Sequence, residues 1–248
     1  MSMATANVVA IIQARMGSTR LPGKVMKDLE GETVLSRVFR RAKRAATIGE
    51  VIIATSDAAG DDVIVGECKK LTAKVFRGDE RDVLDRYYRA AQLFRADVVV
   101  RITADCPLID PEITDKTVGE FLREGPDYAS NALTRTYPRG LDTEVFSMQA
   151  LERAWMEASQ EYQRAHVGPY FFENPEKFKL LAVKGEKDYS GMRWTLDTPE
   201  DLEFLRAVYA RFPGRGDFGW LEVLGMLERE PQLLELNRNV AQKTVHEG

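Results

Sequence analysis

The alternation of apolar runs and amphipathic stretches in the first 110 residues most limits what this chain can fold into. Short runs rich in Val and Ile, each long enough for one buried strand, alternate with stretches that gather apolar residues on one helical face. This alternation predicts an α/β fold with a mostly parallel sheet and helices on both of its faces. The predicted strands are 7–14, 50–54, 74–76 and 97–102, and the predicted helices are 33–46, 58–72 and 80–94.

The pattern is less regular after residue 125. We interpret residues 1–248 as one domain in which residues 125–190 form an inserted subregion. Thr198 is expected to cap a helix over 199–212, with Pro199 at its first position. The other predicted elements are strands at 127–131, 142–146, 178–183 and 193–196 and helices at 148–159 and 160–173.

Composition excludes several classes of protein. With 44% hydrophobic and 30% charged residues the chain is typical of folded proteins, and its net charge of −4 gives no reason to expect nucleic acid as a partner. No apolar run approaches the ~20 residues that span a bilayer, and the N-terminus does not resemble a signal peptide. We therefore expect a cytoplasmic protein without a membrane partner. Two distant cysteines, Cys68 and Cys106, and only two histidines argue against a disulfide framework or a Cys/His metal centre.

Basic residues are concentrated near the N-terminus. Several of them fall in the predicted helix at 33–46, opposite its apolar face, and we interpret them as a solvent-exposed face. The basic residues of the preceding loop are better candidates for contacts with an anion. The residues assigned to the exposed helix face are Arg37, Arg40, Arg41, Lys43 and Arg44.

The first candidate motif is the loop at 13–24, QARMGSTRLPGK, which follows the first predicted strand. In open α/β sheets, ligands bind beyond the carboxyl ends of the strands. Gly17 lets the backbone approach a ligand closely, and Arg15, Arg20 and Lys24 bring three positive charges that suit a triphosphate. The loop matches neither GxxxxGK[ST] nor GxGxxG, which weakens ATPase and dinucleotide-binding interpretations. A flexible basic surface loop is the alternative.

Two aspartates follow predicted strands directly. Asp105 lies in RITADCPLID and Asp197 in RWTLDTPED, and carboxylates at strand ends are suited to hold Mg²⁺ between them. A turn residue that bonds its own backbone is the alternative for Asp105. Asp110, before Pro111, is interpreted as a helix cap. Cys106 has no accompanying base and is interpreted as apolar packing rather than as a nucleophile.

Four motifs, IIQARMGSTRLPGK, ITADCPLID, GLDTEVF and WTLDTPEDL, occur in this order over residues 8–206. Together they resemble the cytidylyltransferase family that activates sugar acids, and most closely its branch named for the spore-coat polysaccharide protein SpsF. The resemblance implies a nucleotide-diphospho-sugar-transferase-type fold, which is GT-A-like and Rossmann-type. It also implies Mg²⁺-dependent transfer of CMP from CTP to a sugar acid or another small anionic acceptor, with release of pyrophosphate, in polysaccharide or glycoconjugate precursor synthesis. A homodimer is expected, with residues 125–190 as the acceptor and dimerisation region.

The resemblance also implies roles for individual residues. The metal ligands are Asp105 and Asp197, and the catalytic residues are Arg15, Lys24 and Asp105. The nucleotide-binding residues are Gln13, Ala14, Arg15, Gly17, Ser18, Arg20, Lys24, Thr55, Asp57, Arg101 and Thr103. The acceptor-binding residues are Arg139, Asp142, Glu144 and His166.

Two other functions are compatible with this sheet architecture. A GT-A glycosyltransferase would use a sugar nucleotide and a DxD motif, but Asp105 has no acidic partner two residues away. An inactive nucleotide-binding scaffold is less compatible with a chain that keeps the charged loop and both aspartates. The residues do not identify the acceptor, and the choice of CTP depends on the resemblance alone.

Overall fold

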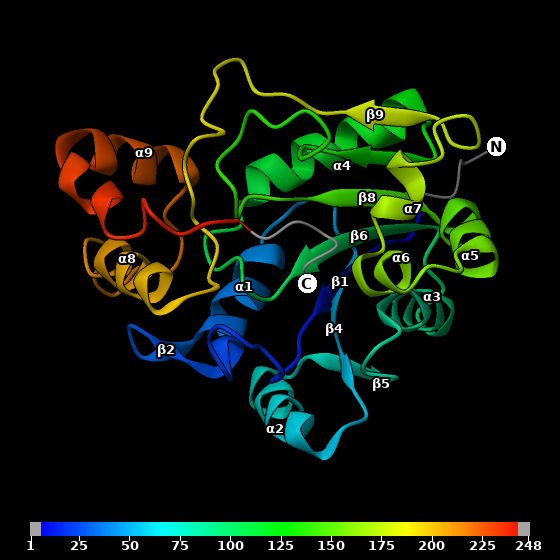
Figure 1. Ribbon diagram of the computed structural model, residues 1–248, viewed down its shortest axis with the longest axis horizontal. Helices are drawn as coiled ribbons and strands as arrows, with labels where there is room; N and C mark the ends of the chain where they lie inside the picture. Colours follow the sequence, from blue (N-terminus) through cyan, green and yellow to red (C-terminus); the bar gives the residue numbers. More distant parts are fainter. Residues whose placement is uncertain (1–5, 243–248) are drawn as a thin grey trace.

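The computed structural model describes residues 6–242 and shows a seven-stranded sheet in the order β5-β4-β1-β6-β8-β7-β9 (Figure 1). Four strands from the first half of the chain run parallel, and of the other three only β8 runs against them. The predicted mostly parallel sheet is therefore confirmed. The strands are β1 (Val8–Gln13), β4 (Glu50–Ser56), β5 (Lys74–Gly78), β6 (Val98–Thr103), β7 (Tyr128–Ser130), β8 (Glu144–Ser147) and β9 (Leu180–Ala182).

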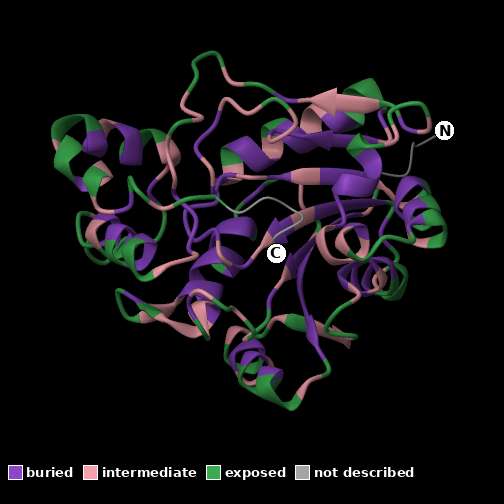
Figure 2. Ribbon diagram, in the orientation of Figure 1, coloured by how far each residue is buried: buried purple, intermediate pink, exposed green. Residues whose placement is uncertain are grey.

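Helices cover both faces of the sheet because its central strands are apolar on both sides. Val8, Ala10 and Ile12 of β1 pack toward one face, whereas Val9 and Ile11 pack toward the other. Figure 2 shows the buried strands enclosed by helices whose outer faces are exposed. The first face holds α1 (Val34–Ala42), α2 (Asp62–Leu71) and α4 (Pro111–Glu124), and the second holds α3 (Val83–Leu93), α5 (Met148–Glu157), α6 (Glu161–His166) and α7 (Pro169–Phe172).

A third apolar cluster lies beside the sheet around α8 (Pro199–Tyr209) and α9 (Trp220–Arg229) (Figure 1). Thr198 caps α8 as predicted, since its Oγ1 accepts a hydrogen bond from the N–H of Asp201. The strand predicted at 193–196 is wrong, because this segment forms only one isolated bridge, between Arg139 and Arg193. Its apolar side chains are buried in the third cluster, and its backbone does not pair with a neighbouring strand as a ladder would.

Two helix predictions also need correction. The helix predicted over 160–173 is divided into α6 and α7, because Val167 has a φ of +65° and Pro169 supplies no N–H to a continuing helix. The basic residues of α1 are exposed only in part, because Arg37 and Arg41 are 8% and 1% exposed.

Arg37 and Arg41 are buried because other segments cover that side of α1. Arg37 donates to the carbonyl of Leu29 in the hairpin of β2 (Asp28–Leu29) and β3 (Glu32–Thr33). Arg41 donates to the carbonyls of Ile109 and Gly216, at 2.7 and 3.2 Å.

Three short 3₁₀ helices complete the fold: η1 (Lys24–Met26), η2 (Ala59–Asp61) and η3 (Pro231–Glu235). Among residues 6–242, none of the helices combines the length and the apolar character needed to cross a bilayer.

Candidate active site

The loop between β1 and η1 lies at the edge of the sheet where the parallel strands end. Two backbone N–H groups, from Ser18 and Gly23, donate to the carbonyl of Met16 at 2.9 and 3.1 Å and fold the loop back on itself. Gly23 has a φ of +67°, a left-handed conformation that glycine adopts readily. Arg15 and Gly17 remain exposed in the loop, whereas the chain turns inward at Lys24.

Lys24 lies between the two predicted metal-binding carboxylates. Its Nζ is 2.5 Å from Oδ2 of Asp105 and 2.8 Å from Oδ1 of Asp197. Asp105 follows β6, and Asp197 directly precedes the cap of α8. Residues that are 92 positions apart in sequence (105 to 197) thus meet at one ammonium group.

The charges of this cluster stabilise one another. Burial alone would lower the pKa of Lys24, but Asp105 and Asp197 outweigh it and raise that pKa above its usual value. Burial opposes ionisation of Asp105, yet Lys24 holds the pKa of this carboxyl below its usual range. For Asp197 the effects of Lys24, Arg193 and Arg20 outweigh burial and hold the pKa at about 2. At neutral pH the cluster therefore contains two carboxylates that share one ammonium.

The donor set fits a magnesium ion. Within residues 6–242 there is no group of three or more His, Cys, Asp or Glu side chains that could enclose a metal ion. Mg²⁺, however, is usually held by one or two carboxylates together with water and substrate phosphates. The ammonium of Lys24 between Asp105 and Asp197 shows that these oxygens converge on a cation.

Asp197 is also held by two arginines, of which only Arg20 was a predicted site residue. Arg20 and Arg193 approach its Oδ2 at 2.9 and 2.7 Å. Arg193 also pairs with Asp201, which is fully buried, and Asn237 donates to both Asp201 and the carbonyl of Arg193. The motif RWTLDTPED contained Arg193 and Asp201, but only the folded chain brings Asn237 to them.

The segment after η3 also reaches the site. The carbonyl of Ala241 accepts a hydrogen bond from Arg20 at 3.3 Å, and Oε1 of Gln242 accepts one from Arg193 at 2.6 Å. The sequence of this segment carried no signal of these contacts.

A second network lies where β4 ends. Asp61, 3% exposed, accepts hydrogen bonds from the hydroxyls of Thr55 and Ser56 and from the N–H of Met16, the last at 2.7 Å. Although burial raises the pKa of Asp61, these hydrogen bonds lower it below its usual value. Thr55, predicted to bind nucleotide, is thus fully buried and bonded to Asp61, and Asp57 is exposed. Asp61 anchors the loop after β1 to β4, and no sequence motif marked it.

Two of the four predicted acceptor-binding residues line a separate pocket of about 430 Å³. Glu144 and His166 line it, together with Arg101, which pairs with Glu144 and donates to Oε1 of Gln13 at 3.1 Å. The hydroxyl of Tyr128 donates to Oε2 of Glu144 at 3.0 Å. Arg101, which was predicted to bind nucleotide, therefore lies with the predicted acceptor-binding residues Glu144 and His166.

The other two predicted acceptor-binding residues, Arg139 and Asp142, do not line this pocket. Asp142 pairs with Arg135, and the Arg139 side chain makes no hydrogen bond or ion pair among residues 6–242, although burial and neighbouring arginines lower its pKa. Thr103 Oγ1 lies 3.2 Å from Sγ of Cys106. Burial raises the pKa of Cys106 well above its usual value, so this thiol is protonated and suited to packing.

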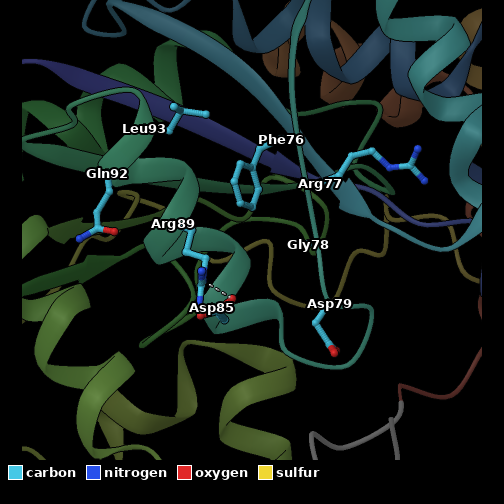
Figure 3. A pocket seen from close by; sticks show the side chains of 8 residues that line it. All are labelled: Phe76, Arg77, Gly78, Asp79, Asp85, Arg89, Gln92 and Leu93. Carbon is cyan, nitrogen blue, oxygen red and sulfur yellow. Dashed lines mark hydrogen bonds and ion pairs between the residues drawn. The ribbon is translucent and has the colours of Figure 1, made fainter.

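A larger but shallow groove of about 650 Å³ lies between β5 and α3 (Figure 3). Its charged side chains are partly paired, Arg89 with Asp85 and Arg77 with Asp62. It contains none of the predicted site residues.

Comparisons with known proteins identify the class to which this site belongs. A solved cytidylyltransferase from Leptospira borgpetersenii superimposes with a TM-score of 0.89 at 35% identity, over 96% of this chain and 100% of that one. The chain is a nucleotidyltransferase, and the predicted nucleotide-diphospho-sugar-transferase-type fold is confirmed.

The particular family follows from the sequence matches. A family model described as cytidylyltransferase matches residues 9–234, so the chain belongs to the cytidylyltransferase family. SpsF, the spore coat polysaccharide biosynthesis protein of Bacillus subtilis, is 34% identical over 91% of this chain and 95% of that protein. A 3-deoxy-manno-octulosonate cytidylyltransferase from Anaeromyxobacter dehalogenans is 30% identical over 82% of this chain and 98% of its own. The resemblance to this family and to its SpsF-like branch is confirmed.

Proposed function

We propose that this enzyme transfers CMP from CTP to a sugar acid or another small anionic acceptor and releases pyrophosphate, with Mg²⁺ as cofactor. The observation that carries the proposal is the convergence of Lys24, Asp105 and Asp197 at the end of a basic loop. Membership of the family supports CTP as the substrate. The names of the two relatives support a role in polysaccharide or glycoconjugate precursor synthesis and a sugar-acid acceptor.

In this reaction an acceptor oxygen attacks the α-phosphorus of CTP in line. A new bond forms between that oxygen and the phosphorus, the bond to the β-phosphate bridging oxygen breaks, pyrophosphate leaves, and a hydroxyl acceptor releases its proton to solvent. Such transfer needs mainly positioning and neutralisation of charge. Arg15, Arg20 and Lys24 bind the phosphates and neutralise the charge that grows on the departing pyrophosphate. When bound between Asp105 and Asp197, Mg²⁺ would add Lewis-acid polarisation of the phosphate oxygens.

Acceptor binding follows from the pocket beside β8. The Glu144 carboxylate, held by Arg101 and Tyr128, accepts hydrogen bonds from acceptor hydroxyls. The Arg139 guanidinium supplies the positive charge that an anionic acceptor needs, because its side chain forms no direct ion pair among residues 6–242, although Asp142 and Asp197 are near enough to interact with its charge. His166 lies in the same pocket and contributes to acceptor binding.

The test measures pyrophosphate release from CTP in the presence of Mg²⁺ and a panel of sugar acids. We expect release that requires both CTP and one acceptor, and Asp105→Asn and Asp197→Asn should each lower kcat by ~10²–10³. Lys27→Met, in the same region but outside the cluster, is the control. Near wild-type turnover in either aspartate variant would refute the metal assignment, and release from sugar nucleotides alone would indicate a glycosyltransferase.

We also propose that the enzyme is a cytoplasmic homodimer whose interface involves residues 125–190. Exposed apolar side chains in this region, Met156 and Phe172 at 65% and 40% exposure, support the interface. Light scattering after size-exclusion chromatography tests it: Met156→Glu should shift a dimer toward monomer, and a wild-type monomer would refute it.

A further inference from the structure

The two carboxylate oxygens of Asp197 contact different partners. Its Oδ1 lies 2.8 Å from Nζ of Lys24, the ammonium that is also 2.5 Å from Asp105. Its Oδ2 is paired with the guanidinium groups of Arg20 and Arg193, at 2.9 and 2.7 Å. The two arginines therefore orient Asp197 so that its other oxygen, Oδ1, faces the position on which the carboxylates converge.

Arg193 can keep this contact when a substrate binds, because it does not belong to the phosphate-binding loop. Arg20 lies in the loop at 13–24, which we propose binds the triphosphate. Arg193 instead makes two hydrogen bonds to Asp201, from Nε to Oδ1 and from Nη2 to Oδ2, both at 2.9 Å. Asp201 is fully buried and also accepts a hydrogen bond from the backbone N–H of Asp197 at 2.9 Å. One carboxylate thus fixes both the backbone of Asp197 and the guanidinium that orients its side chain.

The segment 237–242 supplies the remaining partners of Arg193. Asn237 is 4% exposed, and its Nδ2 donates to Oδ1 of Asp201 and to the carbonyl of Arg193, both at 3.0 Å. Oε1 of Gln242 accepts a hydrogen bond from Nη1 of Arg193 at 2.6 Å. Each of the three guanidinium nitrogens of Arg193 therefore has an acceptor among the described residues, so the group is fixed from all sides.

The course of this segment follows the site rather than the apolar core. Ala241 and Gln242 are exposed, so burial of apolar surface does not hold them where they are. Both contact the arginines that pair with Asp197, because the carbonyl of Ala241 accepts a hydrogen bond from Arg20 at 3.3 Å and Gln242 accepts one from Arg193. The segment is thus bound by donors of the site itself.

We propose that Arg193 is a positioning residue for Asp197 and that Asn237 and Gln242 hold its guanidinium in place, which sets the affinity of the Mg²⁺ site. The inference deepens the proposed function and rests on it. When the phosphates of CTP bind Arg20, Arg193 stays on Oδ2 of Asp197 and keeps Oδ1 directed toward the position of the cation. Loss of a group that orients a metal-binding side chain usually weakens the metal affinity by about 10- to 100-fold.

Differential scanning fluorimetry with saturating CTP and no acceptor tests the proposal without turnover. The quantity measured is the free Mg²⁺ concentration that gives half of the Mg²⁺-dependent rise in Tm. The proteins compared are the wild type, Asn237→Ala, Gln242→Ala, Gln242→Glu and the control Arg238→Gln. Arg238 is a matched control because it lies in the same segment, its side chain is 70% exposed, and it pairs with Glu235.

We expect Asn237→Ala and Gln242→Ala to raise this Mg²⁺ concentration roughly 10-fold, because Arg193 loses groups that hold it. Gln242→Glu keeps an oxygen acceptor for Nη1 of Arg193 and should stay within about twofold of the wild type. Arg238→Gln should match the wild type. In pyrophosphate-release assays the KM of the acceptor should not change, and saturating Mg²⁺ should restore the kcat of both alanine variants to within about threefold of the wild-type value.

Other outcomes would overturn the proposal. A lower Tm in both alanine variants with an unchanged half-saturating Mg²⁺ concentration would make these contacts purely structural. A lower half-saturating concentration in Gln242→Ala would mean that the segment obstructs the site instead of supporting it. Because Gln242 is exposed, Gln242→Ala decides the matter if Asn237→Ala does not fold. A wild-type enzyme whose Tm with CTP does not depend on Mg²⁺ contradicts the proposed function itself, whereas equal Mg²⁺ dependence in the wild type and all variants contradicts only the role of Arg193.

Discussion

Replacing Lys24 by methionine separates the structural role of its ammonium from the role of the metal. Lys24→Met keeps a similar stem but leaves Asp105 and Asp197 without their shared cation. Asp197 retains Arg20 and Arg193, whereas Asp105 has no second ion-pair partner among the described residues. The loss therefore falls mainly on Asp105, and the pKa of that carboxyl should rise because a buried, unpaired carboxylate favours its neutral form.

The size of the effect follows from burial. Breaking a buried ion pair costs ~3–5 kcal/mol, and the Asp105 and Asp197 side chains are 23% and 15% exposed, which favours the lower end. A cost of ~3 kcal/mol corresponds to a fall in Tm of roughly 6–12 °C for a domain of this size. Mg²⁺ should stabilise Lys24→Met more than the wild type, since the ion can occupy the position that the ammonium leaves.

Differential scanning fluorimetry of the wild type, Lys24→Met and Lys27→Met, with and without Mg²⁺, measures both effects. Lys27 is a suitable control because its side chain makes no ion pair among residues 6–242. Pyrophosphate release should fall ~10²–10³-fold in Lys24→Met even with saturating Mg²⁺, because the charge on the leaving group is less well neutralised. A Tm for Lys24→Met equal to that of Lys27→Met, with or without the ion, would refute the reasoning.

Three further predictions concern other parts of the site. In Gly168→Ala the new Cβ would lie 2.6 Å from Oε2 of Glu144, so the acceptor KM should rise roughly 10-fold or more in steady-state assays while the Kd of CTP stays constant. Asp61→Asn exchanges a buried acceptor of four hydrogen bonds for an amide, which should cost ~1–3 kcal/mol in urea unfolding and weaken CTP binding. Because the pKa of Asp197 is lowered to about 2, the stability that it contributes without Mg²⁺ is fully present above pH 3.8 and is lost as the pH falls toward 2. The acid-unfolding curve of Asp197→Asn should lack this loss.

The regular half of the fold could be predicted from the sequence because its central strands β1, β4 and β6 are buried on both faces. A strand such as Val98–Thr103 is then an almost continuous apolar run, which can be recognised although its partners β1 and β8 are not its neighbours along the chain. The prediction of a strand at 193–196 was wrong because burial alone does not make an apolar run a strand. Its apolar side chains are buried, but against α8 and α9, and local pattern does not reveal which partner buries a residue.

Only part of the site could be predicted, because some of its residues are marked by the local sequence and others only by contacts with distant segments. Asp105 stood out because it follows the apolar strand β6, and Lys24 because it ends a basic loop after β1. Asp197 was singled out through a strand that does not form, although the aspartate does lie in the site. Asp61 and Asn237 did not, since their importance comes from hydrogen bonds to segments far away in sequence. Arg41 was misjudged because a basic residue opposite an apolar helix face is normally exposed, and here Ile109 and Gly216 supply acceptors instead.

Strand order also separates the residues that we propose for the two ligands. The loop after β1, anchored to β4 by Asp61, carries the proposed phosphate-binding residues, and β8 carries Glu144 of the proposed acceptor pocket. Ser56 at the end of β4, which donates to Asp61, and Glu144 on β8 are three strand spacings apart, roughly 14 Å. Substitutions at such separated positions usually contribute additively.

The arrangement therefore predicts that CTP binding and acceptor binding are energetically independent. In the double variant Asp61→Asn with Gly168→Ala, the loss of kcat/KM should equal the product of the two single losses, within about twofold. The rate of pyrophosphate release, measured at limiting CTP and limiting acceptor for all four proteins, provides the comparison. A double variant no worse than the weaker single variant would mean that both positions act through one shared element. The proposed separation of the CTP and acceptor sites along the sheet would then be wrong.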